Sequence, residues 1–182
     1  MMTKVTVVDA TLIAASSSTK NASGERDPDM KQSRKGNQWY IGMKAHIGVD
    51  VHSGMAHSVA GLAANVNDVT QAETLLHGHE QAAFDDAGYQ GARERSEAFG
   101  PTWYAAMRPG LRRHLNPFIA PQFKALTLQK WTAGIRAKVE HPFRVLRRRF
   151  GYAKVRYRGL AKDTAKVATL FLLGNLFRRD AD

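Results

Sequence analysis

Cysteine is absent from this chain of 182 residues, so disulfide bridges and zinc sites built on thiolates are excluded. Long apolar runs are missing as well, because the most apolar late stretch, VATLFLLGNLF at residues 167–177, is too short to cross a bilayer. The opening MMTKVTVVDATLIAA lacks the basic segment and long apolar core of a secretory signal peptide. These absences predict a cytoplasmic protein in a reducing compartment, with no membrane-spanning segment.

Acidic residues are scarce in the second half of the chain. Residues 101–182 hold 18 Lys and Arg against 4 Asp and Glu, whereas residues 1–100 hold 9 against 12. Since 43% of the residues are hydrophobic, the charge belongs to a folded body, and the length suits one domain over residues 1–182. A basic half on such a body predicts a face for nucleic acid, with an anionic membrane surface as the competing partner.

The first half of the chain has the pattern of a sheet. Apolar and β-branched residues predict a buried strand over Val5–Ile13. Residues 16–38 are polar throughout and predict a long loop, which either lacks order or contacts DNA. Alternation of apolar and polar residues then predicts an antiparallel hairpin that turns at residues 52–54 and leaves one face wet, the face of His46 and Asp50.

Helical and extended patterns follow one another in the rest of the chain. Asp68 and Gln71 form a capping box that predicts a helix over residues 67–78. An apolar strand follows at Ala82–Asp86, and a further strand is expected within residues 102–107. The basic half has helical patterns at residues 121–134, 138–150 and 161–179. This order predicts an α/β fold with a basic helical C-terminal half.

Two aspartates lie near the ends of predicted strands, where α/β proteins build their sites. Asp9 lies between Val8 and Ala10, in an apolar strand where a carboxylate is costly unless it is paired or binds a metal. Asp86 precedes Ala-Gly-Tyr, and the glycine permits a sharp turn and the close approach of a ligand. Turn capping is the alternative role for Asp86, and Asp85 is an alternative ligand that faces the other side of the strand.

Glu140 is the only acid within residues 135–159, a segment that carries nine Lys and Arg. One explanation is an intrahelical pair with Arg136 or Arg144, each four residues away. The other is a metal ligand, because a helix over residues 138–150 places Glu140 between an apolar stripe and a basic face. Pro142 predicts that a helix either begins near Glu140 or bends there.

Carboxylates that are brought together repel one another, and a hard cation relieves that repulsion. Mg²⁺ prefers oxygen ligands, and it is usually held by few carboxylates together with substrate phosphates. Two such ions, about 4 Å apart, assist an in-line displacement at phosphorus by activating the attacking oxygen and stabilising the leaving one. Asp9, Asp86 and Glu140 are therefore the predicted metal ligands and catalytic residues.

Four motifs of the chain resemble, in their order and spacing, the catalytic domain of DDE transposases of the insertion sequence five family, relatives of the insertion sequence four group. The motifs are VVDATLIAA, GNQWYIGMKAHIGVD, FDDAGYQG, and RAKVEHPFRVLRRRFGY with the RYRGLAK that follows it. The resemblance covers nearly the whole chain and implies an RNase H-like fold, a mixed sheet with helices on both faces. It also implies a triad of Asp9, Asp86 and Glu140 on two Mg²⁺ ions, for which Mn²⁺ substitutes.

The related signature Tyr-x2-Arg-x3-Glu-x6-Lys is matched in part. Arg136 and Glu140 stand in their positions, whereas Arg147 replaces the lysine as another cation able to hold phosphate, and Ala133 replaces the tyrosine. The expected DNA contacts are Lys35, Arg136, Arg144, Arg147, Arg148, Arg149, Lys154, Arg156 and Arg158. Family members also carry an N-terminal DNA-recognition region. Because this chain begins eight residues before Asp9, a truncated copy or one of two reading frames is expected.

The preferred interpretation is a transposase catalytic domain that cuts the ends of an element and joins the 3′-hydroxyl to target DNA. The resemblance implies that it works as a homodimer on transposon ends and target, in the nucleoid. A DNA-binding remnant without turnover and a metal-dependent nuclease without strand transfer are the two alternatives. Inverted repeats in the flanking DNA would favour the transposase.

Overall fold

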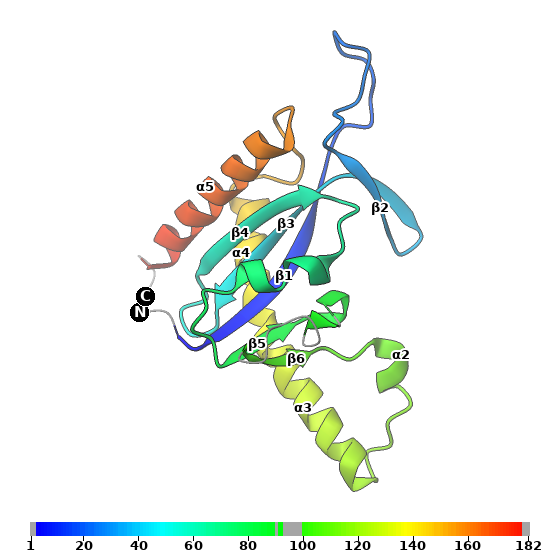
Figure 1. Cartoon of the computed structure of the whole chain (residues 1–182), viewed down its shortest axis with the longest axis vertical. Coiled ribbons are helices and arrows are strands. Elements are labelled where there is room, and N and C mark those ends of the chain that lie inside the picture. The colour runs from blue at the N-terminus through cyan, green and yellow to red at the C-terminus, as the bar shows by residue number, and fades with distance from the viewer. Residues whose placement is uncertain (1–2, 90, 93–99, 180–182) are drawn as a thin grey trace.

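A mixed β-sheet forms the centre of the computed structural model, which describes residues 3–89, 91–92 and 100–179 (Figure 1). Its strands are β1 (Val5–Ala14), β2 (Lys31–Lys35), β3 (Gln38–Asp50), β4 (Ala56–Ala63), β5 (Ala82–Asp85) and β6 (Thr102–Ala105). The order is β2-β3-β1-β5-β6, and β4 pairs with the second half of β3. β1 is antiparallel to β3 and parallel to β5, which is in turn parallel to β6. The predicted α/β class is confirmed, and the sheet is consistent with an RNase H-like fold.

β1 lies in the middle of this sheet, as its apolar, β-branched sequence predicts. Val7 and Val8 are both fully buried, and they point to opposite faces. Val7 belongs to the larger core cluster beneath the helices, whereas Val8 belongs to a smaller cluster on the other face. A strand that is buried on both faces has no water to solvate a carboxylate, so the polar residues within it must find partners at its exposed end.

The basic half of the chain forms the helices. They are α2 (Pro109–Arg112), α3 (Ala120–Arg136), α4 (Glu140–Arg144) and α5 (Leu160–Arg179), with a 3₁₀ turn at Ala137–Val139 and a π-helical turn at Val145–Arg149. The segment from Val139 to Leu146 and α5 cover one face of the sheet, whereas all four residues of α2 are exposed. The expected apolar stripe is confirmed, since Val139, Phe143 and Leu146 are buried in the larger cluster. Pro142 is the third residue of α4, where its missing N–H costs little, so a new helical segment begins at Glu140.

α5 packs against β4 and closes the larger cluster with Val167, Leu170 and Phe171, as its pattern predicts. Phe177, near the end of α5, is 45% exposed and packs against Phe150. None of the helices in the described ranges is long and apolar enough to cross a membrane.

The other face is covered by short 3₁₀ turns, at Asp68–Gln71, Glu73–Leu75 and Ala87–Tyr89. The helix predicted for residues 67–78 is therefore wrong. Asp68 does not cap it, because no side chain bonds to the first turn and the Asp68 carboxylate instead pairs with Lys44. The first two of these 3₁₀ turns bury Val69 and Leu75 in the same cluster as Val8 of β1.

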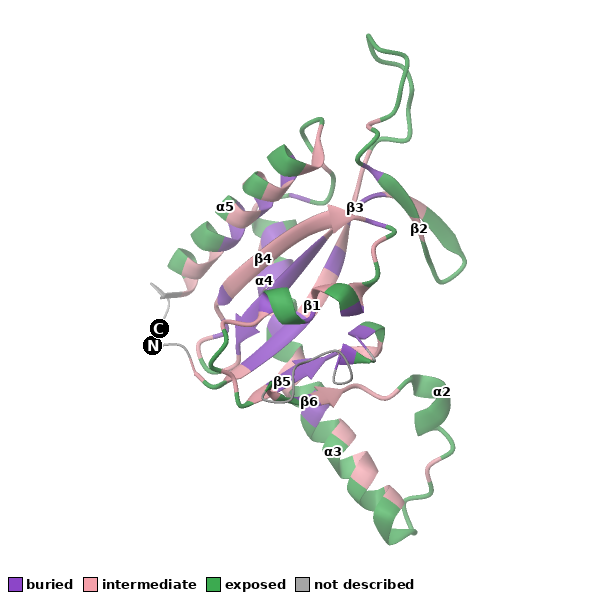
Figure 2. Ribbon diagram, viewed as in Figure 1, coloured by how far each residue is buried: buried purple, intermediate pink, exposed green. Residues whose placement is uncertain are grey.

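The β3–β4 hairpin is confirmed, but its supposed wet face is buried (Figure 2). His46 is 0% exposed because Tyr89 and Asp68 of the 3₁₀ turns lie against it, and Asp50 is 2% exposed, with Thr3 and Ser53 bonded to its carboxylate. Gly48 permits the turn at Glu73–Leu75 to contact β3, since a Cβ there would clash with the Leu75 carbonyl oxygen. The loop predicted for residues 16–38 is also shorter than expected, because Lys31–Lys35 forms β2 and pairs antiparallel with the start of β3.

Candidate active site

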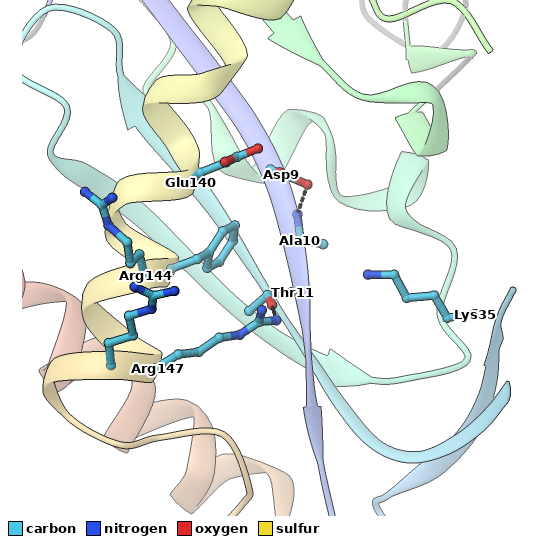
Figure 3. Close-up of a pocket in the computed structure, with 9 residues that line it drawn as sticks. Asp9, Ala10, Thr11, Lys35, Glu140, Arg144 and Arg147 are labelled. Atoms are coloured by element: carbon cyan, nitrogen blue, oxygen red, sulfur yellow. Dashed lines mark hydrogen bonds between the residues drawn. The ribbon is translucent and has the colours of Figure 1, made fainter. Parts of the chain in front are cut away.

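An open cleft of about 410 Å³ lies between β1 and the helix that begins at Glu140 (Figure 3). β1 lines it with Asp9, Ala10 and Thr11, and β2 contributes Lys35. The helical side contributes Glu140, Phe143, Arg144, Arg147 and Arg148. The cleft thus brings two acids and four cations together from three separate parts of the chain.

Asp9 is half-buried in the middle of β1. Burial raises the pKa of its carboxyl group to about 6, and the negative charge of Asp86 raises it further, although the bond from Ala10 and the charge of Arg136 oppose this. One carboxylate oxygen accepts the Ala10 N–H at 2.7 Å (Figure 3). Asp9 is therefore an acid in a poorly solvated position, beside another acid, and it faces an open cleft.

Glu140 is exposed at the start of α4, and its side chain extends from the helix toward β1, where Asp9 lies (Figure 3). It forms no salt bridge with any residue that the structure describes. The intrahelical pair with Arg136 or Arg144, which the sequence left open, is therefore not formed. Glu140 is free to bind something in the cleft.

Asp86 follows the last residue of β5 directly. β5 pairs with β1 in parallel as far as Val7 and Phe84, so the same register, continued by two residues, sets Asp86 level with Asp9. One carboxylate oxygen of Asp86 accepts the Gly88 N–H at 2.7 Å, which holds the turn expected from the glycine. Asp86 therefore both forms the turn and lies near Asp9.

Asp86 lines a second cleft of about 200 Å³, and Ala10 and Lys35 line both this cleft and the first. This second cleft also holds Asp68, Lys44, Leu12, Ser33 and Arg34. Asp9 and Glu140 line one cleft and Asp86 the next. Within the described ranges, no three His, Asp or Glu side chains are gathered closely enough to bind one ion.

Asp85, the alternative ligand, lines neither of these clefts. It is fully buried, and neither of its carboxylate oxygens has a hydrogen-bond partner in the described part of the chain. Burial raises the pKa of Asp85 to about 7, with a further contribution from the charge of Asp86. Its position fits the expectation that it faces away from Asp86.

Four of the expected DNA contacts line the first cleft: Lys35, Arg144, Arg147 and Arg148. Arg147 also donates a hydrogen bond to the Thr11 hydroxyl on β1 (Figure 3). Arg136 lies close enough to influence the charge of Asp9, but its Nε is buried and has no partner among the described residues.

The other expected contacts lie apart from the cleft. The Arg149 guanidinium lies over the Phe177 ring, 4.3 Å from its centroid, and so it is directed at α5. Arg156 and Arg158 line a separate cavity of about 310 Å³ against the loop between β1 and β2, where Arg158 donates to the Ser23 hydroxyl. The backbone of Lys154 forms an isolated β-bridge with Ala14 at the end of β1. Four of the expected contacts thus line the first cleft, two line the separate cavity, and Arg136, Arg149 and Lys154 belong to neither group.

The sequence analysis missed four residues beside Asp86: Lys44, His46, Asp68 and Tyr89. Lys44 and Asp68 form an ion pair at 2.8 Å, and the Tyr89 hydroxyl bonds to His46 Nδ1 at 3.0 Å. Burial lowers the pKa of His46 to about 4, despite the nearby charge of Asp68, so this imidazole is neutral at pH 7. The alternating pattern of β3 did place Lys44 and His46 on one face of the strand, but that face was predicted to be in contact with water.

Residues 1–176 match a family model described as the transposase DDE domain, which spans nearly the whole chain and includes all three candidate acids. No solved structure matches the chain.

Proposed function

This chain belongs to the transposase DDE domain family, and we propose that it cuts DNA strands and joins them with the help of divalent metal ions bound at Asp9, Asp86 and Glu140. The observation that carries the proposal is that Asp9 and Glu140 line the same cleft. Asp86 follows the neighbouring strand β5, at the level of Asp9. Metal-assisted hydrolysis and transesterification at phosphorus use acids of this kind to hold the ions beside the phosphate.

The donor set fits two Mg²⁺ ions, with Mn²⁺ as a substitute. Carboxylate oxygens are the ligands that these hard cations prefer, and none of the acids is neutralised by an ion pair within the described residues. Burial and the charge of Asp86 raise the pKa of Asp9, which is the condition that a bound cation relieves. When bound, such ions activate the attacking oxygen and stabilise the leaving one.

The basic side chains around the cleft are proposed to hold the DNA backbone. Lys35, Arg144 and Arg148 are exposed and lie on both sides of the acids, so a phosphate placed at the acids would lie within their reach. Arg147 would keep β1 and the helix together through Thr11 until it meets a phosphate. Because phosphate contacts position DNA without reading bases, this surface gives affinity rather than sequence preference.

Arg156 and Arg158 would hold a second stretch of the DNA, on the side of the β1–β2 loop. Lys154, Arg136 and Arg149 are proposed to add to the same positive field rather than to contact the scissile phosphate. Action on two transposon ends calls for two active sites, so we take the active complex to be a homodimer on DNA.

The proposal is tested with labelled DNA duplexes that carry transposon-end or scrambled sequences, in Mg²⁺ or Mn²⁺. We expect metal-dependent cutting by the wild-type chain and none by Asp9→Asn, Asp86→Asn or Glu140→Gln. Glu73→Gln is the matched control, because it removes one exposed acid that has no described contact. Cutting without joining would indicate a nuclease, and DNA binding without cutting would indicate an inactive remnant.

A further inference from the structure

Lys44 and Asp68 form an ion pair at the floor of the second cleft, beside Asp86. The Lys44 ammonium donates to Asp68 Oδ1 at 2.8 Å and to the Val66 carbonyl oxygen at 2.9 Å. The two side chains are only 18% and 23% exposed, so the pair is shielded from water and salt. One oxygen of Asp68 is thereby fixed, and the other is turned toward the segment that carries Asp86.

Gly88 is the point at which Asp68 and Asp86 meet. A Cβ at this residue would lie 2.9 Å from Asp86 Oδ1 and 3.1 Å from Asp68 Oδ2. Both carboxylates therefore pack against Gly88, and the Gly88 N–H donates a hydrogen bond to Asp86 Oδ1. Only glycine leaves room for both, so the fixed Asp68 limits where this turn and its Asp86 can move.

Tyr89, the next residue, is held in the same way. Its hydroxyl bonds to His46 Nδ1, and both residues are fully buried. His46 Nε2 has no hydrogen-bond partner in the described part of the chain and lies 3.8 Å from Asp68 Oδ1. Lys44 and His46 both belong to β3, which pairs with β1 along its whole length. Tyr89 is thus bonded to β3 through His46, and Gly88 packs against the Asp68 carboxylate that Lys44 of β3 holds.

We propose that Lys44 and Asp68 are positioning residues that fix the Asp86 carboxylate for metal binding, an inference that rests on the proposed function. Asp86 follows the end of β5 and has no strand pairing of its own, so its direction depends on the turn at Gly88. Lys44 fixes the Asp68 carboxylate through the ion pair, and this carboxylate packs against Gly88 in the turn. Groups that orient metal ligands in this manner typically change metal affinity by about 10–100-fold when removed.

Two variants separate positioning from simple charge. Asp68→Asn removes a negative charge near the site, and Lys44→Met removes a positive one. If the two residues acted only through their charges, Asp68→Asn would weaken the binding of a divalent cation and Lys44→Met would strengthen it. Positioning predicts that both changes weaken binding, because each breaks the same bond.

The experiment measures Mn²⁺ binding to the full chain from the electron paramagnetic resonance signal of the free ion, in the absence of DNA. We expect Asp68→Asn and Lys44→Met each to raise the Mn²⁺ dissociation constant by about 10-fold or more. Lys44→Arg, which keeps the cation, should remain within about 3-fold of the wild type. Glu73→Gln controls for the loss of one exposed acid on the same segment and should bind as the wild type does. Circular dichroism shows that each variant is folded before it is compared.

Lys44→Met binding Mn²⁺ as tightly as the wild type, or more tightly, would overturn the positioning role. The same holds if Lys44→Arg loses as much affinity as Lys44→Met. Asp86→Asn distinguishes this failure from a failure of the proposed function. If Asp86→Asn also binds Mn²⁺ normally, the metal site itself has been misplaced, and the role of Lys44 and Asp68 falls with it.

Discussion

Asp9 and Glu140 face the same cleft from the central strand of the sheet and from the first turn of α4. Phe143, one turn after Glu140, is buried in the larger core, so packing of the helix fixes the direction in which Glu140 extends. Asp9 is fixed by its strand. The two acids are thus held by elements whose stability does not depend on the acids themselves.

Glu140→Gln is expected to abolish metal-dependent cutting of DNA. The amide keeps the size of the side chain but is a much poorer ligand for a hard cation. DNA affinity should stay equal or rise slightly, because one negative charge leaves a basic surface. Gel assays of cutting and fluorescence anisotropy of binding, at the same salt concentration, measure the two effects. Cutting that survives this change would remove Glu140 from the active site.

The cations of the cleft should account for much of the salt dependence of DNA binding. Arg144→Gln and Arg148→Gln are each expected to reduce the slope of log affinity against log salt by about one unit. Arg149→Gln should reduce it by less, because its guanidinium lies over Phe177. Equal effects at all three positions would mean that DNA covers α5 as well as the cleft.

Asp9→Asn is expected to stabilise the protein in the absence of metal. It removes a half-buried charge that is repelled by Asp86, and a gain of about 1–2 kcal/mol in the free energy of unfolding follows. Urea denaturation in EDTA at pH 7.5 measures the gain. Mg²⁺ should stabilise the wild type and not the variant, so equal stabilisation of both would show that the ion binds elsewhere.

Asp50 contributes stability that depends on pH. Burial would raise its pKa, but hydrogen bonds from Thr3 and Ser53 outweigh burial and hold the pKa well below the ordinary value. A depressed pKa means that the stabilisation is present above the pKa of the unfolded chain, about 3.9, and is lost as the pH falls below it.

Asp50→Asn should therefore lower the free energy of unfolding by about 2–3 kcal/mol at pH 7. The difference from the wild type should shrink as the pH falls from about 5 toward 2, as measured by urea denaturation across that range. A difference that does not change with pH would mean that the hydrogen bonds, rather than the charge, carry the effect.

The sheet and the candidate triad could be predicted because strong local patterns mark them. Val5–Ile13 is apolar and β-branched, and Asp9 is conspicuous within it. The Asp-Ala-Gly-Tyr run marks the end of β5, and a single acid among nine cations marks Glu140. Each signal lies within a few residues of the chain, so no knowledge of distant contacts is needed to find it.

The environment of Asp86 could not be predicted, because distant segments create it. The capping box at Asp68 and Gln71 is a sound local signal for a helix. Lys44 of β3 takes the Asp68 carboxylate instead, and the segment forms 3₁₀ turns that cover β3. The same turns bury His46, and Thr3 and Ser53 bond to the buried Asp50, although alternation had placed both residues in water. Tertiary contacts outweighed both local patterns.

Anomalous scattering from Mn²⁺ in a crystal of the chain with bound DNA tests the central claim most directly. The account predicts one or two manganese peaks, each about 2.0–2.5 Å from carboxylate oxygens, that together involve Asp9, Asp86 and Glu140. A DNA phosphate should complete the coordination, and Asp68 should remain paired with Lys44. Manganese bound at other acids, or none beside Asp9 when DNA fills the cleft, would contradict the account.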